Sequence, residues 1–328
     1  MKRFLRVLLI IFVIGTGAAS WYFYELYKNV EETANAIYDP LTSVSAAQAP
    51  PPLGPQPQPQ PFQATDVPTT KEQKTDDQQA NKAISILLFG VDKRGTDAGR
   101  SDTIIYLVSN PSLKKTLMFS IPRDTRTQIS DVGRQDKINH AYAFGGMSAT
   151  VRTVESFLNT PIDYYVKVDM EGFLNIIDSL GGVEVDNPRA FSYEGFRFEK
   201  GKISLDGKRA LAYARMRHDD PEGDFGRNKR QQLIIEELMA KAKEIGTVNK
   251  LDEVLADIGS SVKTNLTFDD MQNLMFHYKS ALDQINVLRI GGQGEMINGI
   301  YYYVVPDEER SRIKQEIDTV LHGSAQHS

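Results

Sequence analysis

An uninterrupted apolar run near the N-terminus limits how this chain can fold. Residues 7–24 contain no charged side chain, and the run is close to the shortest helix that can cross a bilayer. Lys2, Arg3 and Arg6 precede it, and four aromatic residues end it. Basic residues stay on the cytoplasmic side and aromatic rings favour the interface. We therefore predict a cytoplasmic tail at 1–6, a single-pass anchor in the cell membrane at 7–24 and an extracytoplasmic remainder. A signal peptide cleaved near residues 18–20 is the alternative.

The next segment differs in composition from everything that follows it. Residues 25–38 are compatible with a short helix, whereas residues 39–80 are rich in proline and glutamine and almost free of aliphatic side chains. Such a sequence cannot bury a core and is typical of a disordered spacer. We therefore predict an extracytoplasmic stalk at 25–81 and a folded domain at 82–328. No linker composition interrupts this domain, so we treat it as one unit.

Apolar runs and helical periodicity alternate along the domain. Buried strands are predicted at 83–91, 103–109, 116–122 and 163–169, and further strands at 183–186 and 285–290. Helical patterns cover 136–146, 147–159, 170–182, 227–245, 250–257, 267–281 and 306–321. This alternation predicts an α/β fold, with a mixed central sheet flanked by helices on both faces.

Charge and residue usage exclude several kinds of site. The net charge of −5 argues against a nucleic-acid-binding protein, because such binding depends on a basic surface. The chain has no cysteine, and its histidines form no HxH or HExxH pair, so a histidine or cysteine zinc site is not expected. His140 lies among apolar residues of a predicted helix and is expected to be a hydrogen-bonded structural histidine.

Three charged residues are expected to meet at one edge of the sheet. Asp92 ends the first predicted strand, Asp102 begins the second and Arg123 follows the third. They stand at the same edge if these strands are antiparallel neighbours, which the short turn between the second and third favours. Two carboxylates there suit magnesium, which typically takes one or two carboxylates besides phosphate oxygens. Each aspartate taken alone is equally typical of a turn or a cap.

Several arginines lie close together in the stretch 210–233. If the sequence ALAYARMR is extended, Arg215 and Arg217 project from the same face. A helix is predicted to start at Asp224, which places Arg227 and Gln231 on one face of it. Convergent guanidinium groups match phosphate oxygens and suggest a polyanionic ligand. A solvated, salt-bridged helix start is the alternative.

Seven ordered motifs resemble those of the LytR-CpsA-Psr family of wall-polymer ligases, over roughly residues 84 to 245. They are GVDKR…GRSDTIIYL, SIPRDT, KINHAYAFGG, YYVKVDMEGF, DSLGGVEVD, LDGKRALAYARMR and GDFGRNKRQQ. The resemblance implies an extracytoplasmic enzyme that uses a polyprenyl-pyrophosphate-linked glycan, of the teichoic acid or capsule type. It would transfer the glycan with its proximal phosphate to peptidoglycan, assisted by Mg²⁺. Two alternatives remain open, which are a non-catalytic module that binds lipid-linked precursors and a polyprenyl-glycan pyrophosphatase.

The resemblance also implies roles for individual residues. It implies that Asp92 and Asp102 hold the magnesium ion, and that Asp92 is a candidate base toward the acceptor hydroxyl. It implies a pyrophosphate clamp and supporting head-group contacts, and it implies an apolar tunnel for the lipid that the stretch ILLFGV can line. The clamp residues are Arg123, Arg215 and Arg217, and the supporting contacts are Arg94, Arg100, Arg227 and Gln231.

Overall fold

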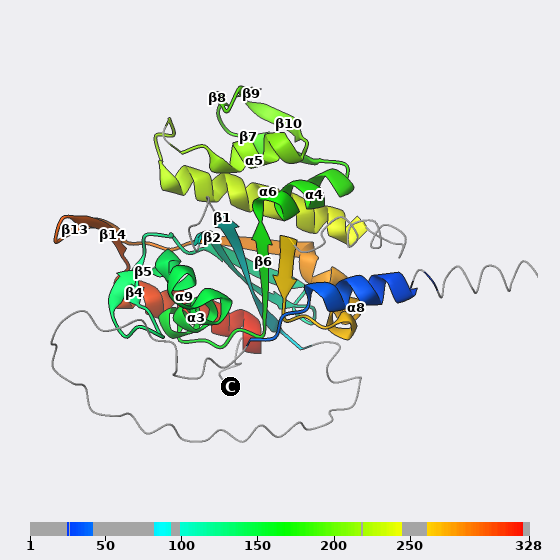
Figure 1. The fold of residues 1–328 in the computed structure, drawn as a ribbon, viewed down its shortest axis with the longest axis horizontal. Coiled ribbons are helices and arrows are strands. Elements are labelled where there is room, and N and C mark those ends of the chain that lie inside the picture. The colour runs from blue at the N-terminus through cyan, green and yellow to red at the C-terminus, as the bar shows by residue number, and fades with distance from the viewer. Residues whose placement is uncertain are drawn as a thin grey trace, which may run out of the picture.

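A mixed six-stranded sheet forms the centre of the molecule (Figure 1). The computed structural model describes residues 25, 27–41, 82–92, 99–217, 219–244 and 261–323. The strand order is β11-β6-β1-β2-β3-β12. The bounds are β1 Ile84–Asp92, β2 Arg100–Asn110, β3 Lys115–Ser120, β6 Tyr164–Asp169, β11 Val262–Thr264 and β12 Gln284–Arg289.

The first three strands are antiparallel neighbours, as the sequence predicts. The sheet is mixed because β6 joins β1, and β12 joins β3, in parallel. The edge at which β1 ends is therefore the edge at which β2 begins and β3 ends. This topology brings the positions after β3 to the start of β2.

Side chains of β2 alternate between two cores on opposite faces of the sheet. Ile104 and Tyr106 belong to a cluster with α3 and α9, whereas Ile105 and Leu107 belong to a cluster that packs against α6. Successive residues of a strand point to opposite faces, so a continuous apolar run contributes side chains to both cores. The predicted helices on both faces are confirmed. They are α3 Ala141–Leu158 and α9 Asp307–His322 on one face and α6 Asp224–Glu244 on the other.

A smaller layer covers the α6 face of the sheet. Helices α4 and α5 pack with α6 and with two short hairpins, above the sheet in Figure 1. Its buried centre includes Ile177, Phe198, Tyr213 and Ile234. The predicted strand at 183–186 is confirmed as β7, whereas the other strands of this layer are too short to give a clear sequence pattern. The bounds are α4 Met170–Ser179, α5 Gly207–Arg215, β7 Val183–Asn187, β8 Phe191–Tyr193, β9 Phe196–Phe198 and β10 Gly201–Leu205.

The remaining elements lie around the edges of the sheet. Residues 135–137 form a strand rather than the start of the predicted helix, because they pair with residues 126–128. The predicted helix at 250–257 lies outside the described residues. The bounds are β4 Arg126–Gln128, β5 Gln135–Lys137, η1 Ile138–His140, α8 Phe268–His277, η3 Lys279–Asp283, β13 Gln293–Ile297 and β14 Ile300–Val304.

The helix predicted in the stalk packs against the domain. Residues 27–37 are helical, and Val30, Ala34 and Ile37 are buried together with Val262 and Phe268. Asp39 then donates its amide to the Thr264 carbonyl at 2.7 Å, beside the edge strand β11. The chain is thus fixed to the domain through residues 27–39 as well as from residue 82 onward.

The predicted anchor at 7–24 lies outside the described residues. In the part of the chain that the structure describes, no helix is both long and apolar enough to cross a membrane.

The extended reading of ALAYARMR is wrong. Helix α5 continues through Arg215, and the chain becomes extended only at Met216. Asp206 caps the helix by accepting a hydrogen bond from the Arg209 amide at 2.8 Å, and Ala210, Ala212 and Ala214 face the core. Alanine-rich sequence with such a cap favours a helix. Arg215 and Arg217 therefore do not share a strand face.

Candidate functional site

A bulge in β2 sets the position of Asp102. Gly90 of β1 pairs with Thr103, and the next residue, Val91, pairs with Ser101. Asp102 is therefore the extra residue of the bulge. A bulge bends the strand and redirects a side chain, and here the Asp102 carboxylate meets two partners. Its Oδ2 lies 3.0 Å from Nη1 of Arg123, and its Oδ1 accepts a hydrogen bond from Nδ2 of Asn139 at 3.1 Å.

Arg123 lies between carboxylates from three parts of the chain. Besides Asp102, its Nε lies 3.8 Å from Asp124 Oδ2 and 3.7 Å from Asp224 Oδ1. Its side chain is only 17% exposed. Arginine remains charged in such surroundings, so the site presents a fixed guanidinium group at the sheet edge.

Arg227 stabilises this cluster through contacts with Asp224 and Asp102. It is 6% exposed, and its Nη2 lies 2.8 Å from Asp224 Oδ1 and donates to the Asp102 carbonyl at 3.2 Å. Burial raises the pKa of Asp224, although Arg227 and Arg123 act in the opposite direction. Burial likewise lowers the pKa of Arg227, and Asp224 opposes that effect. Arg227 therefore holds the start of α6 against the bulge of β2.

An apolar cavity of about 330 Å³ lies next to the cluster. It touches Gly90 and Thr103, which flank Asp102 in the bulge, and its polar lining includes Arg215 and Gln231. Along α6 its wall runs from Gln231 to Ala242, about 16 Å at 1.5 Å per residue. Most of the other lining is aliphatic or aromatic, including Leu88, Phe89, Val166, Val168, Phe173, Ile176, Leu211, Ile235, Leu238 and Met239. The stretch ILLFGV therefore does line an apolar cavity.

A buried ion pair joins α6 to the end of α5. Arg230 and Asp220 contact each other, with side chains 7% and 8% exposed. Arg230 Nε also donates to the Tyr213 carbonyl at 2.9 Å, and its Nη2 donates to the Met216 carbonyl. A Cβ at Gly226 would collide with the Asp220 carboxylate, which explains the glycine. Arg230 thus fixes the turn that carries Arg215 and Arg217.

Buried polar atoms without a hydrogen-bond partner within the described residues gather at this place. They include Arg123 Nε, Asn139 Oδ1, Arg227 Nε and Gln231 Oε1. A buried polar atom without a partner costs free energy. A polar ligand beside the cluster would satisfy donors and acceptors of this kind.

The structure describes only some of the other predicted site residues. The backbone of Asp92 lies opposite Arg100 in the pairing of β1 with β2, and its side chain is not among the described ones. Arg100 is exposed at the start of β2, and Arg217 is half-buried just beyond α5. Arg94 lies outside the described residues. His140 accepts or donates a hydrogen bond with Asp136 at 3.0 Å, consistent with a structural role.

The oxygen donors at this edge suit a magnesium ion. Asp102 supplies a carboxylate, and the strand pairing puts the backbone of Asp92 opposite Arg100, two residues before Asp102 on the neighbouring strand. Magnesium binds through few protein carboxylates and keeps several waters, so two aspartates suffice. No group of three or more histidine, aspartate or glutamate side chains forms a closed metal site in the described segments.

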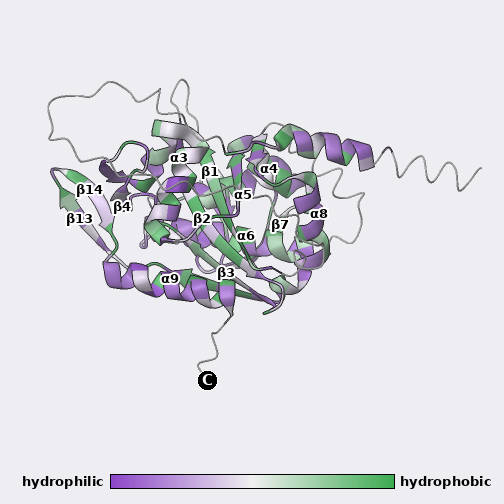
Figure 2. Ribbon diagram, turned by 90° about the horizontal axis from the view of Figure 1, so that it is seen from below, coloured by the Kyte–Doolittle hydropathy of each residue, from purple (hydrophilic) through white to green (hydrophobic). Residues whose placement is uncertain are grey.

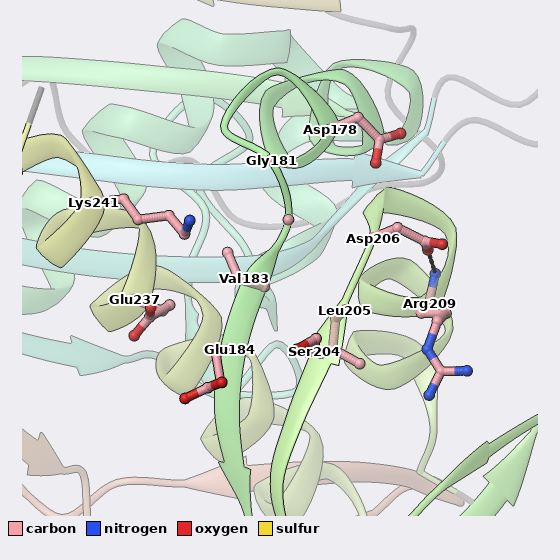
Figure 3. A pocket seen from close by; sticks show the side chains of 11 residues that line it. Asp178, Gly181, Val183, Glu184, Ser204, Leu205, Asp206, Arg209, Glu237 and Lys241 are labelled. Atoms are coloured by element: carbon pink, nitrogen blue, oxygen red, sulfur yellow. Dashed lines mark hydrogen bonds between the residues drawn. The ribbon is translucent and has the colours of Figure 1, made fainter.

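A larger cavity of about 510 Å³ lies elsewhere, between α4, α6 and β10 (Figure 3). None of the predicted site residues lines it. Two of its polar groups have structural partners, because Asp206 caps α5 and Lys241 donates to the Leu180 carbonyl at 3.2 Å. We therefore assign the functional site to the Arg123 cluster and the apolar cavity.

Sequence reasoning missed several residues that complete the site. Asn139 binds Asp102 from an adjacent motif, and Asp224 contacts both Arg123 and Arg227. Asn139 carries no local signal, because only the fold brings η1 to the bulge. The sequence indicated Asp224 as the start of a helix but gave no sign that it contacts the arginines.

Comparison with known proteins gives the same assignment of the fold. The model described as the LytR_cpsA_psr family matches residues 60–319. The polyisoprenyl-teichoic acid--peptidoglycan teichoic acid transferase TagU of Bacillus licheniformis is 48% identical over 239 residues, which cover 73% of this chain and 78% of that protein.

Solved structures agree with this result. The crystal structure of B. subtilis TagU is 44% identical, with a TM-score of 0.60, and the match covers 73% of this chain and 97% of that one. A structure of TagT bound to LI-WTA is 29% identical, with a TM-score of 0.64, over 76% of this chain and 95% of that one.

The Arg230–Asp220 pair is expected to stabilise the fold. Asp220→Asn leaves a buried guanidinium without its charged partner, which typically costs about 3–5 kcal/mol. Burial would raise the pKa of Asp220, but hydrogen bonds from Arg230 and from the Glu222 amide hold it below its usual value of 3.8. Because the folded pKa is lowered, this stabilisation is complete above the unfolded pKa and is lost as the pH falls through the folded pKa.

Chemical denaturation of the wild type and the variant between pH 7 and pH 3 measures this difference. Glu222→Gln is the control, because it removes the exposed pair with Lys229, and such pairs contribute about 1 kcal/mol or less. Equal losses for the two variants would contradict the assignment, as would a loss at Asp220 that persists unchanged at the lowest pH.

Proposed function

The chain belongs to the LytR_cpsA_psr family, and we propose that it transfers a glycopolymer of the teichoic acid class from a polyprenyl-pyrophosphate carrier to peptidoglycan. One observation carries the proposal: a fixed arginine cluster adjoins an elongated apolar cavity. The cluster suits a pyrophosphate and the cavity suits a hydrocarbon chain, so together they suit the two parts of such a donor. The name of the similar transferase supports the glycopolymer and the acceptor.

The reaction is a phosphoryl transfer with a simple balance. A hydroxyl oxygen of peptidoglycan forms a bond with the phosphorus nearest the glycan, and the bridging P–O bond breaks. Polyprenyl phosphate leaves with the bonding electron pair, and the acceptor hydroxyl loses its proton. Negative charge grows on the bridging oxygen as it leaves with polyprenyl phosphate, so catalysis rests on positioned positive charge.

Arg123 and Arg215 are placed to supply that charge. Arg123 is held in orientation by Asp102, Asp124 and Asp224, so little reorganisation accompanies the reaction. Arg215 lies in the wall of the cavity beside Gln231. Arg217, Arg94 and Arg100 are proposed as further contacts with the phosphates or the head group. Arg227 acts through Asp102 and Asp224 and is therefore a positioning residue.

Magnesium is proposed as the cofactor, held by Asp102 and Asp92. The ion would offset charge on the pyrophosphate oxygens when bound. Asp102 already accepts contacts from Arg123 and Asn139, so its carboxylate is oriented before any ligand arrives. Asp92 also remains a candidate base toward the acceptor hydroxyl, although a carboxylate bound to a metal is a weak base.

The membrane is the proposed location of the chain. The charge-free run at 7–24 supports a single-pass anchor with the domain on the outer face. The packed helix at 27–37 would then hold the domain near the bilayer, where a lipid-linked donor resides.

The same site would also support hydrolysis, with water replacing the acceptor hydroxyl. A binding module without chemistry is the second alternative. The oriented Arg123–Asp102 pair favours an enzyme, because capture of an apolar chain does not require it.

Arg123→Ala and Asp102→Asn are expected to abolish most transfer. Loss of one preorganised charge typically lowers kcat by about 10²–10³. The assay uses the full-length chain in detergent with a short-chain polyprenyl-pyrophosphate glycan, peptidoglycan and Mg²⁺, and follows polyprenyl phosphate and glycan attachment. Calorimetry of Mg²⁺ binding without the donor separates the two roles, because the affinity should fall markedly for Asp102→Asn.

Arg197→Ala is the matched control, since this arginine is 77% exposed and lies on β9 in the smaller layer. Its activity should equal that of the wild type. Donor binding without transfer or hydrolysis in the wild type would favour the binding module instead. Hydrolysis without attachment would favour the pyrophosphatase.

Met239→Trp is expected to discriminate between donors by chain length. Met239 lines the apolar cavity two turns beyond Gln231, so a larger ring displaces a distant part of the hydrocarbon chain. Each buried CH₂ group contributes about 0.8 kcal/mol, so KM for a long-chain donor should rise by about tenfold or more. A donor with a short chain should be little affected.

Ala240→Trp provides the control, because Ala240 is the exposed neighbour on the same helix. Steady-state kinetics with both donors measures the effect. An equal response of short and long donors to Met239→Trp would argue against chain binding in this cavity.

A further inference from the structure

The hairpin β13–β14 exposes several large apolar side chains. Met296, Ile300 and Tyr301 are 67%, 49% and 45% exposed. Asn298 and Gly299, both with positive φ, form the tight turn between the strands, as expected for a two-residue hairpin loop. An exposed apolar patch of this kind typically marks an interaction surface.

The hairpin is attached directly to the catalytic cluster. Tyr303 donates its amide to the Asp124 carbonyl at 2.8 Å, and Asp124 follows Arg123. The Tyr303 ring packs edge-on against Phe225 at 5.2 Å, and Phe225 follows Asp224. The base of the hairpin thus rests on the immediate neighbours of two members of the cluster, so its surface is continuous with the site.

The ring of Tyr301 packs over the paired strand of the hairpin. A Cβ at Gly294 would lie 2.8 Å from this ring, so the ring covers the glycine on the paired strand. Lys137 Nζ lies 6.0 Å from the ring centroid and 2.8 Å from Asp124 Oδ1. An aromatic ring that already packs on its own hairpin loses less conformational entropy when it binds.

Charge around the hairpin indicates the chemistry of its partner. Arg126 is exposed, and its guanidinium carbon lies 6.0 Å from the Tyr302 ring centroid. The Tyr302 ring is buried, and Lys137 Nζ lies 6.0 Å from it and from the exposed Tyr301 ring, so both cations lie near Tyr302. Sugar rings present C–H bonds that pack on exposed aromatic rings, and peptide carboxylates pair with exposed cations. Peptidoglycan combines both groups.

The position of the hairpin argues against a membrane as its partner. It projects from the end of the molecule opposite to helix 27–37 in both views (Figures 1 and 2). That helix follows the charge-free run at 7–24, so the hairpin points away from the proposed anchor.

We propose that the β13–β14 hairpin is the acceptor-binding element, on which Tyr301 packs against a sugar ring of the peptidoglycan strand while the exposed Arg126 attracts a peptide carboxylate. This inference rests on the proposed function and names the surface that guides the acceptor hydroxyl to the Arg123 cluster.

Sedimentation of the full-length chain in detergent with purified, teichoic-acid-free peptidoglycan tests the proposal. Tyr301→Ala should raise the Kd for peptidoglycan about tenfold, equivalent to about 1.4 kcal/mol, and should raise KM for peptidoglycan in the transfer assay. Tyr301→Phe keeps the ring and should bind almost as the wild type does. Gly294→Val should resemble Tyr301→Ala, because it displaces the ring.

Phe276→Ala is the matched control. Phe276 is a 63% exposed aromatic residue on α8, and its removal should leave peptidoglycan binding unchanged. Thermal unfolding curves confirm that each variant is folded. Unchanged binding and KM for folded Tyr301→Ala overturn the inference while wild-type transfer still supports the proposed function. A Tyr301→Ala defect in liposome binding but not in peptidoglycan binding also overturns it, in favour of a membrane contact. Absence of both transfer and hydrolysis in the wild type contradicts the function itself.

Discussion

The guanidinium group of Arg123 is the interaction on which the site depends, because it joins parts of the chain that are far apart in sequence. It contacts Asp102 in the bulge of β2 and Asp224 at the start of α6. Each partner is held in turn, Asp102 by Asn139 and Asp224 by Arg227. The result is a positive charge that is fixed before substrate binds, which is the property that a phosphoryl-transfer site requires.

Helix α6 links this charge to the apolar cavity. Its first turns carry Asp224, Arg227 and Arg230, and its later turns supply Ile235, Leu238 and Met239 to the cavity wall. One helix therefore sets the distance between the place for a pyrophosphate and the place for a hydrocarbon chain. The buried Arg230–Asp220 pair completes the link, because it ties the same helix to the turn that follows Arg215.

Much of this arrangement could be predicted from the sequence, and the exceptions have physical causes. The apolar runs and a short turn predicted three antiparallel strands, and this topology alone brings Asp102 to Arg123. The two-residue spacing of Arg215 and Arg217 suggested a strand, but the cap at Asp206 and the buried alanines stabilise a helix. Asn139 reaches Asp102 only through tertiary structure. The Asn298–Gly299 sequence is typical of a hairpin turn, but the strands beside it are short and mostly exposed, so they lack the apolar alternation that predicts a strand.

The most direct test of the account is a crystal structure of the chain with a bound polyprenyl-pyrophosphate glycan. The account predicts that the pyrophosphate contacts Arg123 and Arg215, with the hydrocarbon chain lying along α6 from Gln231 toward Ala242. A pyrophosphate bound away from Arg123, for example in the larger cavity beside Asp206 and Lys241, would contradict it.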